Sequence, residues 1–342
     1  MRRVLVSAAE PSGDVLGAEL VNALKSLGPA SFFGLAGPRM RAAGVEPIAD
    51  MEDVSAMGIV EVLGRLPKIL ETKSRLRSAI ADQPAAAIFI DAPDLHHPLG
   101  RFARKRGVPS IGYVSPQVWA WRGDRARTMH EIFDQLLCLF AFEPPLFPGT
   151  CATWVGHPVV DRLPSREEVN PMLFGIAPGS RSQEIARMKE PFLAVVDRVR
   201  AQIPDAHFHL LCPADPGPLP DAVSHVTDVR SLSTARGVLT KSGTITLELA
   251  VMGVPQVVAH RVNPLTHGLG RMLIQGIDHI AMPNILARKQ VVPEYIQVLD
   301  PEVLAQALLD LPSAQSVDLR ALGPSGASER AAAQVWTAME AS

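Results

Sequence analysis

Short apolar runs alternate with longer amphipathic runs along the first half of the chain. Residues 3–8, 86–90 and 110–114 have the length and apolar content of buried strands. Residues 16–27 repeat apolar positions with the period of a helix, which stops at Gly28. Strands that alternate with helical segments are typical of a parallel α/β sheet.

The same alternation restarts in the second half. Residues 173–177, 207–212 and 237–240 are predicted strands, and residues 190–202 are a predicted helix. A further helix is expected to follow the third strand and to run through Val251. The chain has 342 residues, about twice a common single-domain length, so the repeated pattern predicts two α/β domains.

The seam between the two domains is expected in residues 156–170, which carry two prolines and a polar run. We place the N-terminal domain at residues 1–163 and the C-terminal domain at residues 164–327. Each is predicted to contain an open parallel sheet, with ligands beyond the carboxyl ends of its strands. The turns after the strands are therefore where chemistry is expected.

Composition narrows the class of protein. Hydrophobic residues make up 47% of the chain and charged residues 20%, which suits a buried core and excludes disorder. With a formal net charge of −2, the protein lacks the positive electrostatic field of a general nucleic-acid binder. Cys138, Cys151 and Cys212 are widely separated, so they fit buried thiols in a reducing compartment better than a disulfide framework or a zinc site.

The N-terminal apolar run is too short for a membrane segment. Glu10 and Asp14 interrupt it, and no stretch approaches the ~20 apolar residues that span a bilayer. We expect a cytoplasmic protein that is soluble or at most peripheral on a membrane.

The first strand-to-helix turn reads Glu10-Pro11-Ser12-Gly13-Asp14. The free N–H groups at the start of the following helix favour an anion. Simple capping by Ser12 or Asp14 explains the same residues. Both interpretations stay open on the sequence alone.

A second turn, Asp91-Ala92-Pro93-Asp94, directly follows a predicted strand. A carboxylate on a proline-stiffened turn is well placed to accept a proton from a substrate hydroxyl. The alternative is an Asx turn, in which Asp91 bonds its own backbone.

Metal ligands are not predicted. The spacing of Asp91 and Asp94 differs from the D-x-D through which many sugar transferases hold a divalent cation. The pairs His96-His97 and His207-x-His209 have no carboxylate or cysteine at matching spacing, so we interpret them as structural.

In the second half, a turn at residues 178–181 follows the first strand. Gly179 permits close approach of the backbone, Ser180 can cap a helix, and Arg181 offers paired donors that match a diphosphate. Glu184 lies one turn further on.

A second such turn consists of Ser242, Gly243 and Thr244 at another predicted helix start. Its N–H groups and hydroxyls suit phosphate, and Glu248 could accept a hydrogen bond from a ribose hydroxyl. Two turns of this kind in one domain predict a nucleotide diphosphate site.

Two of the four tryptophans, Trp119 and Trp121, lie beside Arg122 in one short segment. Two indoles next to a guanidinium could form a platform for a sugar or an acyl group. A core aromatic cluster is an equally good interpretation.

Residues 57–70 have the pattern of a basic amphipathic helix, in which Pro67 is expected to cause a kink or a restart. Such a helix can lie on an anionic membrane surface, although periodicity alone favours an ordinary core-facing helix. The segment carries Met57, Ile59, Leu63, Leu66 and Leu70, with Arg65, Lys68 and Lys73 alongside.

Taken together, these motifs resemble those of the lipid-A-disaccharide synthase family, a group of inverting GT-B glycosyltransferases. The resemblance runs nearly end to end, and the segment Ser-Pro-x-Val-Trp-Ala-Trp-Arg is its most specific part. The matching blocks start at Glu10, Ala36, Met57, Asp91, Tyr113, Phe142, Gly156, Pro178, Ser242, Pro283 and Val292.

The resemblance implies a GT-B fold, in which two Rossmann-like domains face a central cleft. It implies transfer of 2,3-diacylglucosamine from its UDP ester to the 6-hydroxyl of 2,3-diacylglucosamine 1-phosphate, without a metal or other cofactor. It also places the acceptor on the N-terminal domain and UDP on the C-terminal domain, at the cytoplasmic face of the inner membrane. A homodimer is left open.

The resemblance implies roles for five residues: Asp91 as the essential aspartate, Arg181 as the diphosphate arginine, Asn284 as an active-site asparagine, and Glu10 and Ser12 in the first loop. We interpret Asp91 as the base, with Asp94 as the second candidate, and Asn284 as a further contact for the charge on the diphosphate. A membrane or acyl contact for residues 57–70 becomes the favoured interpretation. The chain departs from the family at Leu95-His96, where Phe-Asn is usual.

The Ala-rich tail, residues 328–342, is predicted to form a helix with Ser328 as its N-cap. GT-B proteins often return such a tail to the first domain. Two other functions remain as alternatives: another UDP-sugar GT-B enzyme, such as a UDP-N-acetylglucosamine epimerase, and a non-catalytic nucleotide-sugar binding protein.

Overall fold

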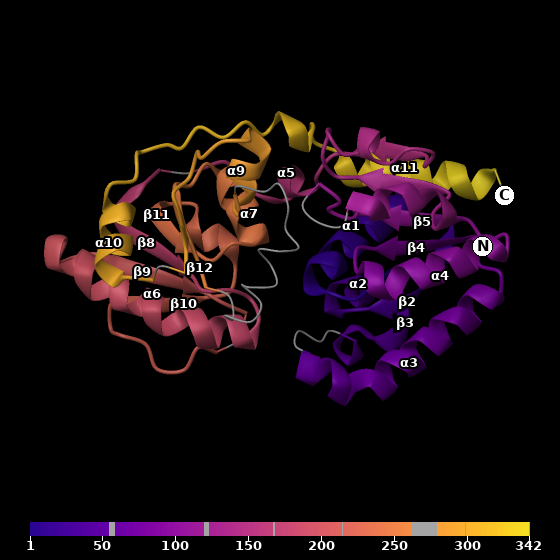
Figure 1. Ribbon diagram of the computed structural model, residues 1–342, viewed down its shortest axis with the longest axis horizontal. Coiled ribbons are helices and arrows are strands. Elements are labelled where there is room, and N and C mark those ends of the chain that lie inside the picture. Colours follow the sequence, from indigo (N-terminus) through magenta and orange to yellow (C-terminus); the bar gives the residue numbers. More distant parts are fainter. Residues whose placement is uncertain are drawn as a thin grey trace. The chain divides into compact units, whose positions relative to one another are not determined.

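The chain forms two compact units in a computed structural model that describes residues 1–54, 59–119, 123–166, 168–213, 215–261, 279–297 and 299–341. Unit 1 comprises Met1–Asp161 and Ala321–Ser342, and unit 2 comprises Arg162–Arg320. The first boundary falls in the segment expected to hold the seam, and the chain returns to unit 1 at Ala321 (Figure 1).

The described part of unit 1 holds a seven-stranded sheet in the order β3-β2-β1-β4-β5-β6-β7. All neighbouring strands pair in parallel. Strand β4 is buried along its whole length rather than alternately, because helices cover both faces of a parallel sheet. The strands are β1 (Arg2–Ala8), β2 (Ala30–Ala36), β3 (Val45–Asp50), β4 (Ala86–Ile90), β5 (Ser110–Tyr113), β6 (Gln135–Cys138) and β7 (Ala152–Trp154).

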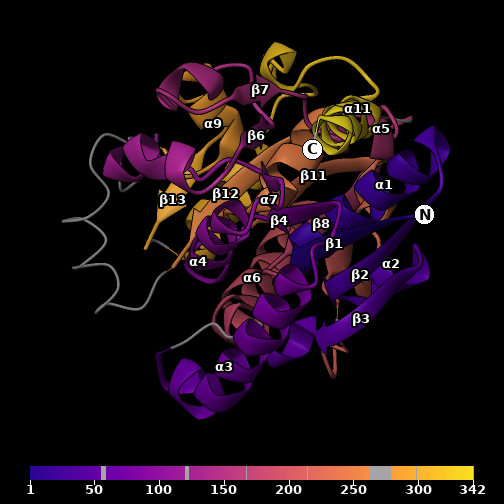
Figure 2. The same cartoon turned by 90° about the vertical axis from the view of Figure 1, so that its right-hand side faces the viewer.

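Helices cover the two faces of this sheet. Leu5, Phe33 and Phe89 point into a core formed with α3 and α4, whereas Ile90, the next residue along β4, lies against α1. Figure 2 shows α1 and α2 on one side of the sheet and α4 on the other. The helices of unit 1 are α1 (Pro11–Leu27), α2 (Pro38–Ala42), α3 (Ile59–Ala81), α4 (Pro93–Lys105) and α11 (Ala327–Glu340), with α5 (Val159–Arg162) at the boundary.

Short 3-10 helices join several of these elements. In unit 1 they are η1 (Met51–Asp53), η2 (Gly123–Glu131), η3 (Pro144–Leu146) and η5 (Arg320–Leu322), the last of which begins at the unit boundary, and unit 2 contains η4 (Val229–Leu232).

The C-terminal helix α11 packs against α1 and also contacts β4 (Figure 1). Its N-cap is Gly326, not Ser328 as expected. The carboxylate of Asp161 accepts from the N–H groups of Gly326 and Ala327, at 3.0 and 3.3 Å, and so supplies the cap. Two N–H groups at the helix start are thus satisfied from a distant segment, which local sequence could not show.

Unit 2 repeats the same strand order within its described residues, β10-β9-β8-β11-β12-β13, again all parallel. Phe174, Phe208 and Leu210 form a core with α6 and α10, and α7 contacts α9 and β12. The elements are β8 (Asn170–Ala177), β9 (His207–Leu211), β10 (Val223–Val226), β11 (Ala235–Thr240), β12 (Gln256–His260), β13 (Glu294–Ile296), α6 (Ser182–Gln202), α7 (Thr244–Met252), α9 (Met282–Ala287) and α10 (Pro301–Leu309).

Most predicted elements are confirmed, and β4 has the predicted bounds. One predicted helix start was wrong. Helix α6 begins at Ser182, eight residues before the predicted start at residue 190. Helix α3 continues through Pro67, so of the two outcomes expected there the restart is wrong, and a kink stays a prediction.

Candidate active site

Each sheet has one point where the strand order reverses, and the predicted site turns lie there. In unit 1 this point is between β1 and β4, where Ala8 pairs with Ile90. In unit 2 it is between β8 and β11, where Ala177 pairs with Thr240. Ligands of open α/β sheets bind at such points, beyond the carboxyl ends of the strands.

The first turn of unit 1 leaves the start of α1 without a side-chain cap. The N-cap is Glu10, which is partly buried, and Ser12 is an exposed residue of the first helical turn. Capping of this helix by Ser12 or Asp14 is therefore wrong. Asp14 is buried, and its carboxylate accepts from the N–H groups of Gly37, Arg39 and Met40, so it caps α2 instead.

The turn after β4 has an unusual backbone. Asp91 and Ala92 have φ values of +50° and +48°, in the left-handed region that few non-glycine residues adopt. The Asp91 N–H donates to the carbonyl of Tyr113 on β5 (3.0 Å), which fixes one side of the turn. The Asp91 side chain is exposed beyond the strand ends.

Asp94 lies three residues further on, in the first turn of α4. Its side chain is 86% exposed and forms an ion pair with Arg125 at 3.1 Å. Asp91 is thus the carboxylate directly at the strand end, and Asp94 stands one helical turn away from it.

Trp119 belongs to an aromatic cluster next to the end of β6. Its ring meets Phe142 edge-on at 5.8 Å, and its Nε1–H donates to Glu143 (3.3 Å). Glu143 is buried and also accepts from the N–H groups of Leu139 and Phe140. Burial raises the pKa of Glu143. These contacts support the cluster interpretation for Trp119, and Trp121 lies outside the described residues.

In unit 2 the turn after β8 surrounds the carboxylate of Glu184. Gly179 has a φ of +134°, and a Cβ there would lie 2.7 Å from Glu184. The Ser180 N–H donates to Glu184 Oε2 (3.3 Å), and Arg181 forms an ion pair with Glu184 (3.5 Å). The N-cap of α6 is Arg181, so Ser180 is not the cap.

Lys241, at the end of β11, completes this group and was missed by the sequence analysis. Its Nζ lies 2.7 Å from Glu184 Oε1, and both side chains are largely buried. Burial raises the pKa of Glu184, but the hydrogen bond and charge of Lys241, with the charge of Arg181, outweigh burial and hold this pKa below its usual value. The signal was available, because Lys241 directly precedes the Ser242 turn.

His260 ends the neighbouring strand β12 and was also missed. Burial, together with the charge of Lys241, lowers the pKa of His260 to about 4. Its buried Nδ1 has no hydrogen-bond partner among the described residues. A neutral imidazole therefore lies on the same edge of the sheet as Arg181 and Lys241.

The second turn of unit 2 opens toward empty space. Gly243 is the N-cap of α7, and a Cβ built on it would meet no heavy atom within 4 Å. The Ser242 hydroxyl donates to the carbonyl of Ile280 (2.6 Å), and Thr244 is the first residue of the helix. Among the described residues, the backbone of Gly243 is therefore open on the side where a side chain would stand.

Two other residues predicted to contact the nucleotide, Glu248 and Asn284, interact with other residues of unit 2. Glu248 forms an ion pair with Arg162 at 2.9 Å. Asn284 is fully buried: its amide donates to Val292 O and Glu294, and its oxygen accepts from the N–H groups of Val291 and Val292. All hydrogen-bonding capacity of this amide is thus used internally. Direct contacts of Glu248 and Asn284 with a nucleotide stay predictions.

Helix α3 divides into two parts. Its C-terminal half packs against the sheet through Leu76 and Ile80, both fully buried. Leu66 and Leu70, nearer the N-terminus, are 43% and 57% exposed. Met57 lies outside the described residues, as do the side chains of Ile59 and Leu63. No helix in the described parts of the chain has the length and apolar content to span a bilayer.

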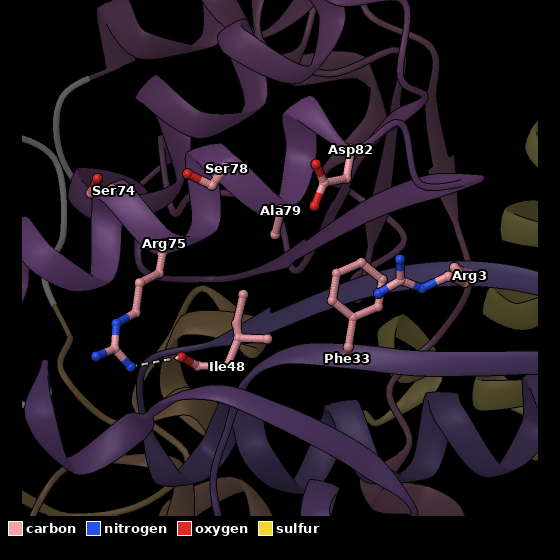
Figure 3. A pocket seen from close by; sticks show the side chains of 8 residues that line it. All are labelled: Arg3, Phe33, Ile48, Ser74, Arg75, Ser78, Ala79 and Asp82. Carbon is pink, nitrogen blue, oxygen red and sulfur yellow. Dashed lines mark hydrogen bonds between the residues drawn. The ribbon is translucent and has the colours of Figure 1, made fainter.

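An open pocket in unit 1 lies away from these turns, between α3 and strands β1 to β3 (Figure 3). Arg3 stacks on Phe33 at 4.6 Å, and Arg75 donates to the carbonyl of Ile48. None of the predicted site residues lines this pocket. Its lining consists of Arg3, Phe33, Ile48, Ser74, Arg75, Ser78, Ala79 and Asp82.

Comparison with solved structures shows the fold. UGT89C1 of Arabidopsis thaliana, complexed with UDP, superposes with a TM-score of 0.62 at 14% identity, covering 99% of this chain and 100% of that one. The calicheamicin glycosyltransferase CalG4 gives 0.59 at 15% identity, covering 100% and 94%. Acinetobacter baumannii MurG gives 0.52 at 15% identity, covering 100% and 99%. The two parallel-sheet units are those of the GT-B fold, as predicted.

Sequence comparison is more specific. A lipid-A-disaccharide synthase of Geobacter sulfurreducens is 40% identical over 323 residues, covering 86% of this chain and 83% of that protein. One of Burkholderia lata is 37% identical over 338 residues, covering 90% and 86%. The family model of lipid-A-disaccharide synthetase matches residues 4–317. The chain therefore belongs to the lipid-A-disaccharide synthetase family.

Proposed function

We propose that this glycosyltransferase joins UDP-2,3-diacylglucosamine to 2,3-diacylglucosamine 1-phosphate (lipid X) and releases UDP. The product is the β-1,6-linked lipid A disaccharide 1-phosphate. The names of the relatives support the product, a lipid A disaccharide. The observation that carries the proposal is a group of donors in unit 2: the Ser180 N–H, Arg181 and Lys241 all contact the carboxylate of Glu184. Beside them, after the neighbouring strand β11, the start of α7 is open at Gly243.

The UDP diphosphate binds to this group in unit 2. The contacts of Glu184 support this, because its carboxylate meets a backbone N–H, a guanidinium and an ammonium at once. A diphosphate offers more acceptor oxygens to the same donors, and the start of α7 adds N–H groups for it. Ser242 and Thr244 provide hydroxyls beside Gly243.

Asp91 of unit 1 acts as the general base. The donor has an α-linked diphosphate and the product a β-linkage, so a single displacement inverts the anomeric carbon. Asp91 accepts the proton of the acceptor 6-hydroxyl as that oxygen bonds to the anomeric carbon. The bond from that carbon to the diphosphate oxygen breaks, and UDP leaves with the electron pair.

Positive charge in unit 2 stabilises the leaving diphosphate. Arg181, Lys241 and the α7 N–H groups meet the charge that develops there, which is the task a metal performs in other transferases. A positioned base contributes a factor of ~10²–10⁴ in rate. Asn284 keeps α9 bound to the Val291–Val292 backbone and to Glu294, so we assign it a positioning role beside the direct contact implied by the resemblance.

Unit 1 holds the acyl-chain acceptor at a membrane surface. Leu66 and Leu70 of α3 are exposed apolar side chains, and Lys68 and Lys73 lie beside them in sequence. An apolar face with lysines suits the anionic surface of a bilayer. We place the protein peripherally on the cytoplasmic face of the inner membrane.

The test is a product assay on the full chain. The protein is incubated with UDP-2,3-diacylglucosamine and 2,3-diacylglucosamine 1-phosphate, with and without EDTA, and the products are identified by mass spectrometry and by NMR of the new linkage. We expect UDP and the β-1,6-linked disaccharide in both arms. Isomerisation of a UDP-sugar without use of the acceptor would support an epimerase, and UDP-sugar binding without turnover would support a sensor.

A further inference from the structure

His96 connects the turn of Asp91 to the centre of the sheet in unit 1. The residue lies in the first turn of α4 and is fully buried. Its Nδ1 is 2.6 Å from the carbonyl oxygen of Asp91, and its Nε2 is 2.8 Å from the hydroxyl of Ser7 on β1. The imidazole therefore bridges the two strands that flank the reversal of strand order.

The partners of the ring fix its tautomer. A carbonyl oxygen only accepts hydrogen bonds, so Nδ1 carries the hydrogen and donates it to Asp91 O. Nε2 is then an acceptor, and the Ser7 hydroxyl donates to it. Burial lowers the pKa of His96 to about 4, so the ring is neutral near pH 7.

The bond to Asp91 holds a turn that would not form readily by itself. The left-handed conformation is unfavourable for a residue other than glycine, and Asp91 and Ala92 are consecutive left-handed residues. The Asp91 N–H is held by Tyr113 O, its carbonyl by His96 Nδ1, and the Ala92 carbonyl by the N–H of His96. Backbone groups on both sides of the Asp91 Cα are thus anchored.

We propose that His96 is a positioning residue that sets the direction of the Asp91 carboxylate toward the acceptor hydroxyl. The inference rests on the proposed role of Asp91 as the base. The direction of a side chain follows the two backbone bonds at its Cα, and release of the Asp91 carbonyl lets the turn relax out of the left-handed region. A displacement of about 1 Å at a reacting group can cost 10²-fold in rate.

Two substitutions separate the two ring nitrogens. In His96→Asn the amide nitrogen occupies the place of Nδ1, so the donor to Asp91 O is kept and the partner of Ser7 is lost. In His96→Gln the amide reaches the place of Nε2, so the partner of Ser7 is kept and the donor to Asp91 O is lost. Both variants place an uncharged amide in the buried site of the imidazole.

The readouts are kcat, the donor KM, UDP affinity and thermal unfolding of the full chain. We expect H96N to keep kcat within about threefold and H96Q to lose about 10²-fold, with donor KM and UDP affinity unchanged in both. A folded H96Q with kcat near that of the wild type would overturn the proposal. A folded H96N with kcat as low as that of H96Q would overturn it too.

A third variant covers the case in which H96Q does not fold. Ser7→Ala leaves the Nδ1 donor to Asp91 O in place and removes only the partner of Nε2, as H96N does, so we expect kcat within about threefold of the wild type with donor KM unchanged. A folded S7A whose kcat falls by about 10²-fold would then contradict the proposal, because the bond to Ser7 and not the donor to Asp91 O would set the rate. Asp91→Asn is assayed alongside. If D91N retains the wild-type kcat, the proposed base is wrong. If D91N is inactive and H96Q is fully active, only the proposed role of His96 is wrong.

Discussion

Gly243 stands at the start of α7 where an added methyl group would touch no protein atom within 4 Å. Substitution by alanine should therefore leave the fold intact and place the methyl group where the diphosphate approaches the helix N–H groups. We expect Gly243→Ala to weaken UDP binding by about tenfold or more, equivalent to about 1.4 kcal/mol, measured by titration calorimetry.

The control for this variant is Gly123→Ala in unit 1, where the nearest atom to an added Cβ is the Val118 carbonyl oxygen at 3.5 Å. Both variants should unfold at the wild-type temperature. If UDP binds G243A as tightly as G123A, the start of α7 is not part of the diphosphate site.

His96 also predicts a dependence of stability on pH. Its pKa is about 4 in the folded chain against an ordinary value of 6.5, so the unfolded chain binds more protons between these values. Stability should therefore fall as pH falls from 6.5 to 4, by at most about 3 kcal/mol from this residue. Urea unfolding at pH 7 and pH 4.5 should show a smaller loss in H96N than in the wild type, and equal losses would contradict the burial of a neutral imidazole.

Some residues of the candidate site could be predicted from the sequence and others could not. Asp91 and Arg181 follow strands within short turns, so their place at the strand ends was predictable from local pattern. His96 was interpreted as structural, because its hydrogen bonds to Asp91 and Ser7 depend on two distant strands and a left-handed turn. Lys241 and Glu184 pair across 57 residues, which periodicity does not reveal.

At the scale of elements, α3 makes a separable prediction. The double substitution Leu66→Ser and Leu70→Ser should reduce binding to vesicles that contain anionic lipid by about fivefold or more. Burial of one leucine side chain in the bilayer contributes a free energy of ~1.5–3 kcal/mol to membrane binding. The fold should be unchanged, because both side chains are exposed. Vesicle cosedimentation measures the effect.

Leu27 provides the matched control, since it lies at the end of α1 in the same unit and is 46% exposed. Leu27→Ser should leave vesicle binding unchanged. Equal binding by all three proteins would remove α3 from membrane contact, and unfolding of the double variant would favour the core interpretation.

The elements themselves were largely predictable, and their ends were less so. The strands beside the sites were found because a fully buried parallel strand is a continuous apolar run. The start of α6 was missed because residues 182–189 are mostly polar and because Pro191 suits the first turn of a helix better than a helix interior, where the structure places it. The capping of α11 by Asp161 joins residues 165 positions apart, beyond the reach of any local signal.

At the scale of the whole molecule, the two units share one strand order and carry different chemistry at the same topological point. Unit 1 places a carboxylate after β4, and unit 2 places cationic groups after β8 and β11. This division follows from the proposed reaction, since the base acts on the acceptor and the cations act on the leaving group. The chain returns to unit 1 at Ala321 and α11 belongs to that unit, which also contains Asp91.

The separate roles proposed for the two units, base catalysis in unit 1 and diphosphate binding in unit 2, can be measured by comparing Asp91→Asn with Arg181→Gln. Both variants are examined in the same transfer assay and in UDP titrations. We expect D91N to lower kcat by ~10²–10⁴ with wild-type UDP affinity, and R181Q to weaken UDP binding by about tenfold or more. A D91N protein that transfers sugar at the wild-type rate, or that loses UDP affinity as R181Q does, would contradict the account.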